Sequence, residues 1–378
     1  MSQTVRPSGL NPYRIQFAGL SFWKGKQVFL TGHTGFKGSW LVRILKNAGA
    51  ELTGYALPPY GDENLYNISR GEECMTSIIG DIRDYNALLN AFRAATPDIV
   101  IHMAAQPLVG ESYKNPLYTF ETNVMGTVNI LECTRACGGI KSFLNITTDK
   151  VYENREWHWG YRETDALNGY DPYSNSKSCS DLITQSYRNS FFTNSTTAVS
   201  TARAGNAIGG GDFTAGRIIP DCVKAARRHE PVLIRNPGAI RPYQHVLEPL
   251  FAYLIIAQAQ YADKQYADCY NVGPEDRDCV TTGALADYFC AAWGDGASWK
   301  SRASANAPHE AAFLKLDCSR LKSVLGWTPR WDIKQAVEKT VEWTRAYLNR
   351  KGITEVMNRQ IKEYLYGIDA ETTRGNAD

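Results

Sequence analysis

Short apolar segments alternate with amphipathic helical segments through the first two hundred residues of the chain. Each short segment has the length of a buried strand, and each longer one repeats its apolar residues at helical spacing. The predicted strands are residues 27–31, 52–57, 76–79, 98–102, 142–147 and 198–203. The predicted helices are the segment from Trp40 to just before Gly49 and residues 85–95, 116–137 and 173–187. Such alternation builds βαβ units, and hence a parallel sheet with helices on both faces.

The pattern changes after about Gly205, where loops lengthen and short strand-like pieces such as residues 231–234 are mixed with helices. A helix near residues 249–261 and a strand near 270–272 are expected to rejoin the main sheet. We therefore predict an α/β fold, a Rossmann-type doubly wound parallel sheet with a smaller mixed α/β C-terminal substrate domain. The predicted divisions are an N-terminal arm (1–20), the sheet domain (21–204, with returning segments at about 243–274) and the substrate domain (205–242 and 275–378).

Composition is that of an ordinary globular protein. Apolar residues make up 43% of the 378 residues and charged residues 21%, with a formal net charge of +2. This balance argues against a nucleic-acid partner or an anionic membrane surface. No apolar run approaches the ~20 residues needed to cross a bilayer. The first twenty residues also lack the continuous apolar stretch of a secretory signal.

Nine cysteines are scattered along the chain. Only Cys133 and Cys137 lie close together, and a two-ligand zinc half-site is one interpretation of them. No second Cys/His pair stands at zinc-finger spacing, so we expect no metal site. The alternative that we favour is reduced thiols in a cytoplasmic protein.

A glycine-rich turn follows the first strand directly. Gly32, Gly35 and Gly38 form the pattern G-x-x-G-x-x-G ahead of an amphipathic helix. Glycine lets the backbone turn sharply and approach a pyrophosphate, and the helix N-terminus directs N–H groups at that anion. Such glycines can also be purely structural, but their position between strand and helix favours a dinucleotide site.

Residues after two further strands are candidates for the rest of the dinucleotide. Asp81 can accept a hydrogen bond from an adenine amino group while Ile82 packs against the ring, although Asp81 could instead cap the next helix. Ala104, Ala105 and Gln106 follow the fourth strand, where small residues let the backbone pass a cofactor. The second strand ends without the acidic residue that often binds the ribose, and no arginine cluster for a 2′-phosphate replaces it. We favour NAD over NADP.

Tyr173 and Lys177 form the pattern Y-x-x-x-K on a predicted helix. Residues four apart share a helix face, so the ammonium should lie beside the phenol and lower its pKa from about 10. A phenolate can take the proton of a sugar hydroxyl while hydride leaves the same carbon. The pattern is common by chance, but Asp171 and Pro172 before it, in a dinucleotide fold, strengthen this interpretation.

Residues 147–150 lie at the end of the fifth strand, beside the point where the strand order reverses. A capping turn with exposed charges would explain them. The functional interpretation needs a hydroxyl to hold a sugar, a carboxyl to donate a proton and a further group to remove one.

These motifs together resemble the extended short-chain dehydrogenase/reductase superfamily. The resemblance is carried by the glycine turn, ITTDKVY at 146–152, DPYSNSK at 171–177 and RAGN at 203–206. Longer stretches are similar to the CDP-D-glucose 4,6-dehydratases, a group of nucleotide-sugar 4,6-dehydratases. They are residues 32–40, 103–109, 169–177, 204–212 and 234–249, extended by 308–311 and 325–327. The resemblance covers about residues 22–343. It departs in the long N-terminal arm, in Thr148, where serine is also common, and in Tyr243, where tryptophan is expected.

The resemblance implies dehydration of CDP-D-glucose to CDP-4-dehydro-6-deoxy-D-glucose, with NAD as cofactor, in deoxysugar biosynthesis such as that of lipopolysaccharide O-antigens. Tyr173, assisted by Lys177, would deprotonate the 4-hydroxyl while the C4 hydride passes to NAD. Thr148 would hold the 4-oxygen, Asp149 would protonate the departing water, and hydride would return to C6. Lys150 would be the C5 base if its pKa falls from about 10.4, and otherwise would stabilise the enolate. Related TDP-glucose dehydratases carry glutamate there.

The resemblance also implies the binding residues, with the sheet domain holding NAD and the smaller domain the nucleotide sugar. The implied NAD contacts are Gly32, Thr34, Gly35, Phe36, Lys37, Gly38, Asp81, Ile82, Ala104, Ala105, Gln106, Asn123, Thr147, Tyr173, Lys177 and Arg203. The implied substrate contacts are Gln106, Thr148, Asn206, Arg217, Ile218, Arg235, Arg241 and His309, with backbone at 218–220 and 232–234 meeting the base. Arginine forks match phosphate oxygens, although each arginine could form a surface salt bridge instead.

Two alternatives remain open at this point. The first is another enzyme on the same fold, a TDP-, GDP- or UDP-sugar dehydratase or a 4-epimerase. An epimerase needs no acid and base for elimination, so Asp149 and Lys150 argue against it. The second is a non-catalytic dinucleotide sensor, which commonly lacks the Tyr173/Lys177 pair. The family expectation for assembly is a homodimer through the helices at 116–137 and 173–190, with a tetramer as the alternative.

Overall fold

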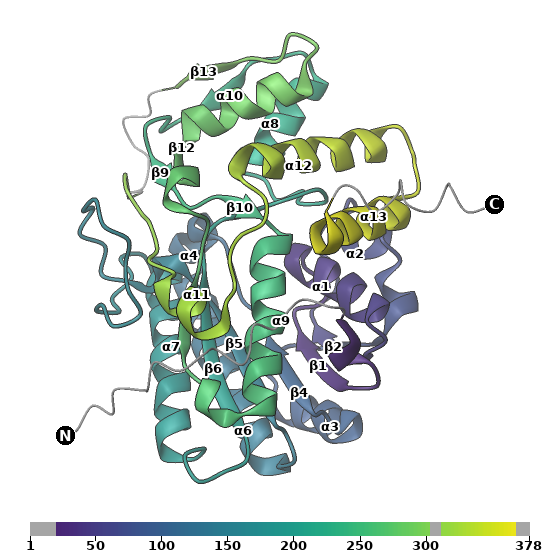
Figure 1. The fold of residues 1–378 in the computed structure, drawn as a ribbon, viewed down its shortest axis with the longest axis vertical. Coiled ribbons are helices and arrows are strands. Elements are labelled where there is room, and N and C mark those ends of the chain that lie inside the picture. The colour runs from purple at the N-terminus through teal and green to yellow at the C-terminus, as the bar shows by residue number, and fades with distance from the viewer. Residues whose placement is uncertain (1–19, 303–310, 368–378) are drawn as a thin grey trace.

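A seven-stranded, fully parallel sheet forms the centre of the protein in the computed structural model, which describes residues 20–302 and 311–367 (Figure 1). The strand order is β11-β6-β5-β4-β1-β2-β3. From β1 the sheet extends on one side through β2 to β3 and on the other side through β4, β5 and β6 to β11. The strands are β1 (Gln27–Thr31), β2 (Glu51–Ala56), β3 (Thr76–Ile79), β4 (Ile99–His102), β5 (Ser142–Thr148), β6 (Ala198–Ala204) and β11 (Cys269–Val272). The predicted doubly wound fold is confirmed, and the segment near 270–272 does rejoin the sheet, as its edge strand.

Helices cover both faces of the sheet (Figure 1). One face packs against α1 (Phe36–Asn47) and α9 (Leu247–Ala262). The other packs against α3 (Tyr85–Ala95), α6 (Gly126–Cys137) and α7 (Pro172–Ser190). Val28 and Leu30 of β1 enter the first core, whereas Phe29 between them enters the second. Successive side chains of a strand point to opposite faces, and a strand apolar throughout is therefore buried on both.

The predicted helix at 116–137 is wrong in one respect. The structure divides it into α5 (Pro116–Phe120), a wider π-helical turn (Glu121–Met125) and α6. The wide turn contains Asn123, whose buried amide bonds to the backbone of Gln106 and to the hydroxyl of Ser176. Single turns of this kind commonly occur where a side chain must reach an inward partner.

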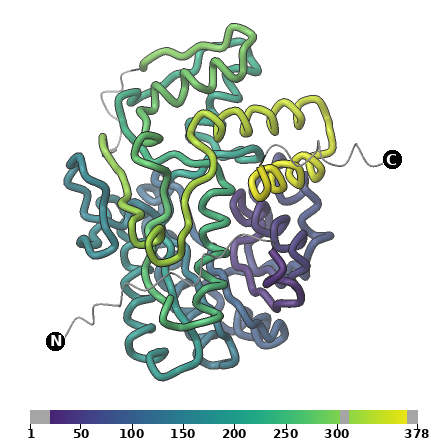
Figure 2. The backbone as a smooth tube through the Cα atoms, in the orientation of Figure 1, coloured from purple at the N-terminus to yellow at the C-terminus, as the bar shows by residue number. Residues whose placement is uncertain are grey.

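A third core lies in the C-terminal half, beyond the carboxyl ends of the strands. It is enclosed by α8 (Ile218–Arg227), β8 (Val232–Ile234), α10 (Thr282–Trp293) and α12 (Ile333–Leu348). The last helix, α13 (Ile353–Tyr366), returns to pack near α1 in the first core (Figure 2). The predicted domain boundaries stay a prediction. The remaining elements are α2 (Leu65–Ile68), α4 (Val109–Lys114), β7 (Ala207–Ile208), β9 (Ile240–Arg241), β10 (Gln244–His245), β12 (Val280–Thr281), β13 (Trp299–Ser301) and α11 (Ser319–Leu325).

Three further features bear on the expectations from composition. In the part of the chain that the structure describes, no helix is both long and apolar enough to span a bilayer. All nine cysteines are free thiols. Within the same residues, no group of three or more His, Cys, Asp or Glu side chains could hold a metal ion.

Glu248, in the first turn of α9, is a buried carboxyl that joins three segments. Its Oε1 accepts hydrogen bonds from the backbone N–H groups of Arg330 and Trp331, at 3.0 and 2.8 Å. Its Oε2 accepts a bond from the Tyr364 hydroxyl at 2.7 Å. Burial raises the pKa of Glu248 to about 7 from an ordinary 4.5, although these bonds oppose the rise.

Glu248→Gln is expected to change how stability depends on pH. Between pH 4.5 and 7 the folded protein keeps a proton on Glu248 that the unfolded chain releases. The free energy of unfolding should therefore fall as pH rises through this window, by up to roughly 3 kcal/mol from this group. Glutamine cannot titrate, so urea unfolding at several pH values should show a smaller decrease in the variant. Equal pH dependence in the two proteins would contradict the assignment.

Candidate active site

The glycine turn joins β1 to α1 and lies directly against the backbone that follows β4. Gly32 has φ +79°, and a Cβ there would stand 2.8 Å from the amide nitrogen of Ala104. A Cβ on Gly38 would stand 2.2 Å from the carbonyl oxygen of Gly32. Both positions therefore require glycine, because a side chain would push the turn away from the sheet.

The N-terminus of α1 fits an anion such as a pyrophosphate. Gly35 is the N-cap residue, and no side chain makes a capping hydrogen bond there. The first N–H groups of a helix have no partner within the helix and attract negative charge. The turn also lies at the carboxyl ends of β1 and β4, where strand order reverses and ligands of open α/β sheets bind. The residues present thus fit the diphosphate of a nicotinamide dinucleotide.

Asp81 lies at the outer end of this crevice, after β3. Its carboxylate pairs with Arg83 at 2.7 Å, and Arg83 also pairs with Glu121 at 3.0 Å. The next helix is capped by Asp84, whose side chain accepts from the Ala87 N–H, so the alternative that Asp81 caps it is wrong. Ile82 is buried. Nearer the turn, Thr34 donates to the carbonyl of Leu57 at 2.9 Å.

Several predicted cofactor contacts have their side chains inside the protein. Gln106 bonds through its amide to Leu108 and Thr119. Arg203 forms a buried, two-pronged ion pair with Asp181, which also accepts a bond from Thr147. The other end of the Arg203 guanidinium donates to the Tyr152 hydroxyl and the Glu163 carbonyl.

These contacts change what we infer for four of the predicted residues. The polar groups of Gln106, Asn123, Thr147 and Arg203 are already bonded within the scaffold. A buried charge or amide needs such partners, because leaving it unpaired is costly. We therefore infer that these side chains hold the strand ends in place and that any contact to a ligand there comes from neighbouring backbone.

The predicted catalytic residues come together where β5 meets the start of α7. Thr148 ends β5, and its hydroxyl donates to Oδ1 of the buried Asp149 at 2.8 Å. Tyr173 is the second residue of α7, which Asp171 caps by accepting from the Ser174 N–H. Thr148 and Asp149 both act on the pKa of the Tyr173 phenol, so the three side chains lie together.

The ionisation of Tyr173 differs from the expectation that Lys177 lowers its pKa. The pKa of Tyr173 rises to about 12, mainly because the phenol is buried and in part because of the charge of Asp149. The Lys177 ammonium instead donates to the carbonyl of Ile146 at 2.9 Å. Burial also lowers the pKa of Lys177 to about 8. The expectation is corrected because desolvation of the phenolate is the largest effect, and the charges that act on it come from Asp149, Arg217 and Asp171.

The surroundings of Asp149 favour its protonated form. Burial raises its pKa, against the charges of Lys150, Arg241 and Lys37 and the bond from Thr148. Its Oδ2 has no hydrogen-bond partner among the described residues. A carboxyl that resists ionisation and has a free oxygen can deliver a proton to a ligand.

Two further side chains reach this cluster. Lys37 was predicted as a cofactor contact. Burial lowers the pKa of Lys37 to about 8, and the charges of Arg217, Asp149 and Asp212 also act on this pKa. Its ammonium lies 6.0 Å from the ring centre of Tyr253 on α9, a fully buried phenol that interacts with Tyr173 and Asp149. Sequence reasoning missed Tyr253, since one tyrosine within an apolar helix carries no signal of its own.

The predicted substrate residues divide into two groups. Arg217 pairs with Asp212 at 3.0 Å, and its charge acts on Tyr173. Arg241 donates to the carbonyls of Ile240 and Ala311, and its charge acts on Asp149. Arg235 is exposed and its charge acts on Asp221 instead.

The other predicted substrate residues are placed as follows. Asn206 is half-buried beside β7, and its carbonyl accepts a bond from the Gln244 N–H. Ile218 begins α8 and is half-buried. His309 lies outside the described residues.

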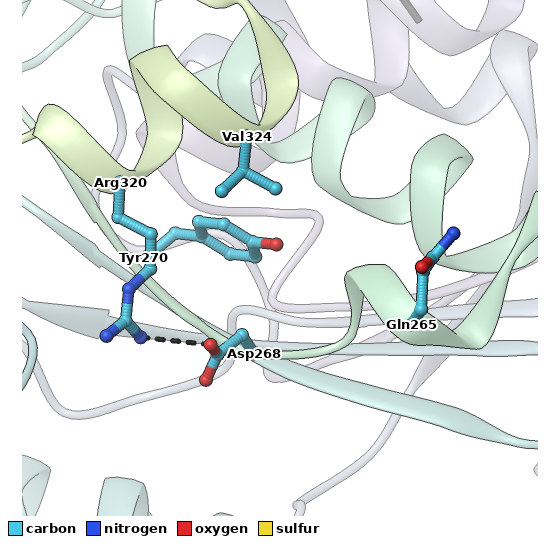
Figure 3. A pocket seen from close by; sticks show the side chains of 5 residues that line it. All are labelled: Gln265, Asp268, Tyr270, Arg320 and Val324. Carbon is cyan, nitrogen blue, oxygen red and sulfur yellow. Dashed lines mark hydrogen bonds and ion pairs between the residues drawn. The ribbon is translucent and has the colours of Figure 1, made fainter. Parts of the chain in front are cut away.

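A separate cavity of about 280 Å³ lies beside the edge strand β11 (Figure 3). Its lining includes Asp268 and Arg320, which are joined by a hydrogen bond of 3.0 Å. Asp268 precedes β11, so this cavity is at the amino end of that strand, away from Tyr173 and Asp149. We therefore do not place the substrate in it.

Comparison with known proteins bears on most of the chain. A family described as "GDP-mannose 4,6 dehydratase" matches residues 29–340. The CDP-glucose 4,6-dehydratase of Salmonella typhimurium is 46% identical over 351 residues, which cover 91% of this chain and 98% of that protein. The dTDP-glucose 4,6-dehydratase of the same organism is 26% identical, covering 84% and 92%.

Solved structures agree on the fold. A dTDP-glucose 4,6-dehydratase from Bacillus anthracis, in complex with NAD, matches with a TM-score of 0.72 at 19% identity, covering 86% of this chain and 98% of that one. A UDP-glucose 4-epimerase from Thermotoga maritima, with UDP-glucose, matches with a TM-score of 0.74 at 20% identity, covering 85% and 99%. At these identities the likeness concerns the fold alone.

Proposed function

The chain belongs to the nucleotide-sugar dehydratase family described as GDP-mannose 4,6 dehydratase, and from this premise we propose that it converts CDP-D-glucose into CDP-4-dehydro-6-deoxy-D-glucose and water. The observation that carries the proposal is the meeting of the Tyr173 phenol and the Asp149 carboxyl at the Thr148 hydroxyl. A base for the 4-hydroxyl and an acid for the 6-hydroxyl then face one hexose. The 46% identity to a CDP-glucose 4,6-dehydratase supports CDP as the nucleotide.

The residues of the cluster have distinct tasks in this reaction. NAD, when bound, supplies the hydride acceptor for C4 and the donor for C6. Tyr173 takes the proton from the 4-hydroxyl, and Thr148 holds the 4-oxygen. Asp149 protonates the 6-hydroxyl as it leaves, while Lys150, whose charge acts on Asp149, either takes the C5 proton or stabilises the enolate. Arg217 and Arg241 bring positive charge for the diphosphate.

Elimination is a better match to this cluster than epimerisation. A 4-epimerase needs only the oxidation and reduction at C4, for which a phenol and a hydroxyl are sufficient. The buried Asp149, with one unbonded oxygen and a raised pKa, has no task in that cycle. In the loss of water, by contrast, Asp149 has the task of protonating the departing 6-hydroxyl.

A panel of nucleotide sugars tests the proposal. The purified protein, supplied with NAD, should convert CDP-D-glucose to a product lighter by one water, with the alkaline absorbance of a 4-keto sugar. TDP-, GDP- and UDP-glucose in parallel reactions should give much less. Conversion of UDP-glucose to UDP-galactose, with CDP-D-glucose untouched, would show the proposal to be wrong.

We also propose that two copies of the chain associate through α5 and α7. Large apolar side chains are exposed along these helices and the turn between α5 and α6, namely Leu117 (72%), Met125 (51%), Leu182 (49%) and Phe191 (52%). Contiguous exposed apolar patches mark interaction sites, and these four side chains lie along the helices that the family expectation places at the interface. We place the protein in the cytoplasm, where free thiols such as its nine cysteines persist.

The double substitution Leu117→Glu with Leu182→Glu is expected to give a monomer. Placing carboxylates on both copies of the shared face adds like charges and removes apolar burial. Light scattering coupled to gel filtration measures the mass directly. Leu233→Glu, at another exposed leucine on β8, is the matched control and should leave the mass unchanged. A monomeric unsubstituted protein would contradict the dimer.

A further inference from the structure

Residues 311–317 lie between two parts of the candidate active site. On one side they pair with β9, where the Ile240 N–H donates to the Ala312 carbonyl at 2.9 Å. On the other side they meet the loop between β5 and α7, whose Tyr161 N–H donates to the Lys315 carbonyl at 2.9 Å. The segment therefore connects β9 to the loop that follows the catalytic residues.

Arg241, the second residue of β9, is 3% exposed and lies at the ligand-binding edge of the sheet. A Cβ on Gly205, directly after β6, would stand 2.7 Å from the carbonyl oxygen of Pro242, so the end of β9 packs against the carboxyl end of β6. The Arg241 guanidinium donates to the carbonyls of Ile240 and Ala311. Two carbonyl acceptors fix the plane of the guanidinium, and that plane decides how well its N–H groups match phosphate oxygens.

Glu156, in the loop between β5 and α7, binds the other end of the peptide group that Arg241 binds. Its Oε1 accepts a hydrogen bond from the Ala312 N–H at 2.6 Å, and the Ala311 carbonyl of the same peptide group accepts from Arg241. A peptide group is a dipole, with its negative end at the oxygen and its positive end at the N–H. The carboxylate and the guanidinium therefore each meet the pole of opposite charge, and both stabilise one orientation of this peptide group.

The backbone of Glu156 has a conformation that residues other than glycine seldom adopt. Its φ is +51°, and its N–H donates to Oδ1 of Asn154 at 2.9 Å. Nδ2 of Asn154 donates to the Phe313 carbonyl at 3.0 Å. Such outliers persist where the surrounding contacts fix them, and they are frequent at functional sites. The loop is thus attached to residues 311–317 beside Glu156 as well as through its carboxylate.

We propose that Glu156 is a positioning residue for substrate binding, because it orients Arg241 toward the diphosphate by way of the peptide group between Ala311 and Ala312. This inference rests on the proposed function, in which Arg241 brings positive charge to the diphosphate. The alternative is a solvated carboxylate, since the Glu156 side chain is exposed. A solvated carboxylate would make no difference to substrate binding, so the two interpretations predict different kinetics.

Glu156→Ala should raise the KM for CDP-D-glucose by about three- to tenfold, the effect expected for the loss of one hydrogen bond. The kcat should change by less than about twofold, because the groups that react with the hexose are untouched. Glu156→Gln keeps an oxygen that can accept from the Ala312 N–H, and it should restore most of the lost affinity. Glu153→Ala removes another half-exposed carboxylate of the same loop, one that pairs with Arg155, and as the matched control it should leave the KM unchanged.

Calorimetric titration with CDP tests whether Glu156 acts through Arg241, and it requires no turnover. Glu156→Ala should weaken CDP binding by about three- to tenfold when Arg241 is present. In an Arg241→Ala background the same substitution should have no further effect, since the two residues act on one peptide group. Arg241→Lys, which keeps the charge but not the planar fork, replaces Arg241→Ala if the alanine protein does not fold.

The contrary results are equally specific. An unchanged KM in Glu156→Ala, or a loss of CDP affinity that is the same with and without Arg241, would overturn the inference. An unsubstituted protein that binds CDP but makes no product from CDP-D-glucose would refute the proposed function instead, so the two failures are distinguishable.

Discussion

Tyr173→Phe is expected to lower turnover of CDP-D-glucose by about 10²–10⁴-fold, the range that a positioned proton acceptor contributes. Phenylalanine keeps the ring at the start of α7 and removes only the hydroxyl that meets Thr148. Binding of the dinucleotide should persist, because the glycine turn and the N-terminus of α1 are untouched. The measurements are steady-state turnover and the amount of cofactor released from the denatured protein.

The matched control for this substitution is Tyr170→Phe. Tyr170 lies three residues before Tyr173 and is 75% exposed, so the same chemical change occurs outside the cluster. Turnover should stay close to that of the unsubstituted protein. Unchanged turnover in Tyr173→Phe would remove that phenol from the mechanism and favour a dinucleotide sensor.

Asp149→Asn is expected to stop the reaction after the oxidation at C4. Asparagine can still accept the hydrogen bond from Thr148, so the local shape is kept. It has no proton to give to the departing 6-hydroxyl, and water loss should slow by about 10²–10⁴-fold. Mass spectrometry of the enzyme-bound nucleotide should then show a sugar lighter by H2 rather than by H2O.

Glu153→Gln is the control for the loss of a carboxylate in the same segment. Glu153 lies four residues further along, with its side chain 46% exposed beside Arg155, and its neutralisation should leave dehydration intact. If Asp149→Asn eliminates water at an undiminished rate, another group is the acid. Asp149 would then only shape the electrostatics of the site.

The local pattern of apolar and polar residues was sufficient to predict most of the fold. The strands at 27–31 and 76–79 and the helix at 85–95 agree with β1, β3 and α3 residue for residue, and the other elements of the sheet domain differ by a few residues at their ends. The exception is the π-helical turn at Glu121–Met125, where a long-range bond from Asn123 decides the local geometry. Nothing in the spacing of apolar residues reports such a bond.

The glycine turn and the Y-x-x-x-K helix were determined by the sequence alone, because backbone freedom and helical periodicity are local properties. Only the tertiary structure decided the charge states of the side chains and which side chains lie next to one another. In the folded protein Arg203 pairs with Asp181, and Tyr253 of α9 lies beside the cluster. The pKa of Tyr173 is raised, whereas the spacing of Tyr173 and Lys177 predicted that this pKa would fall. Ionisation depends on burial and on charges contributed by distant segments, and these are fixed only when the strands and helices pack together.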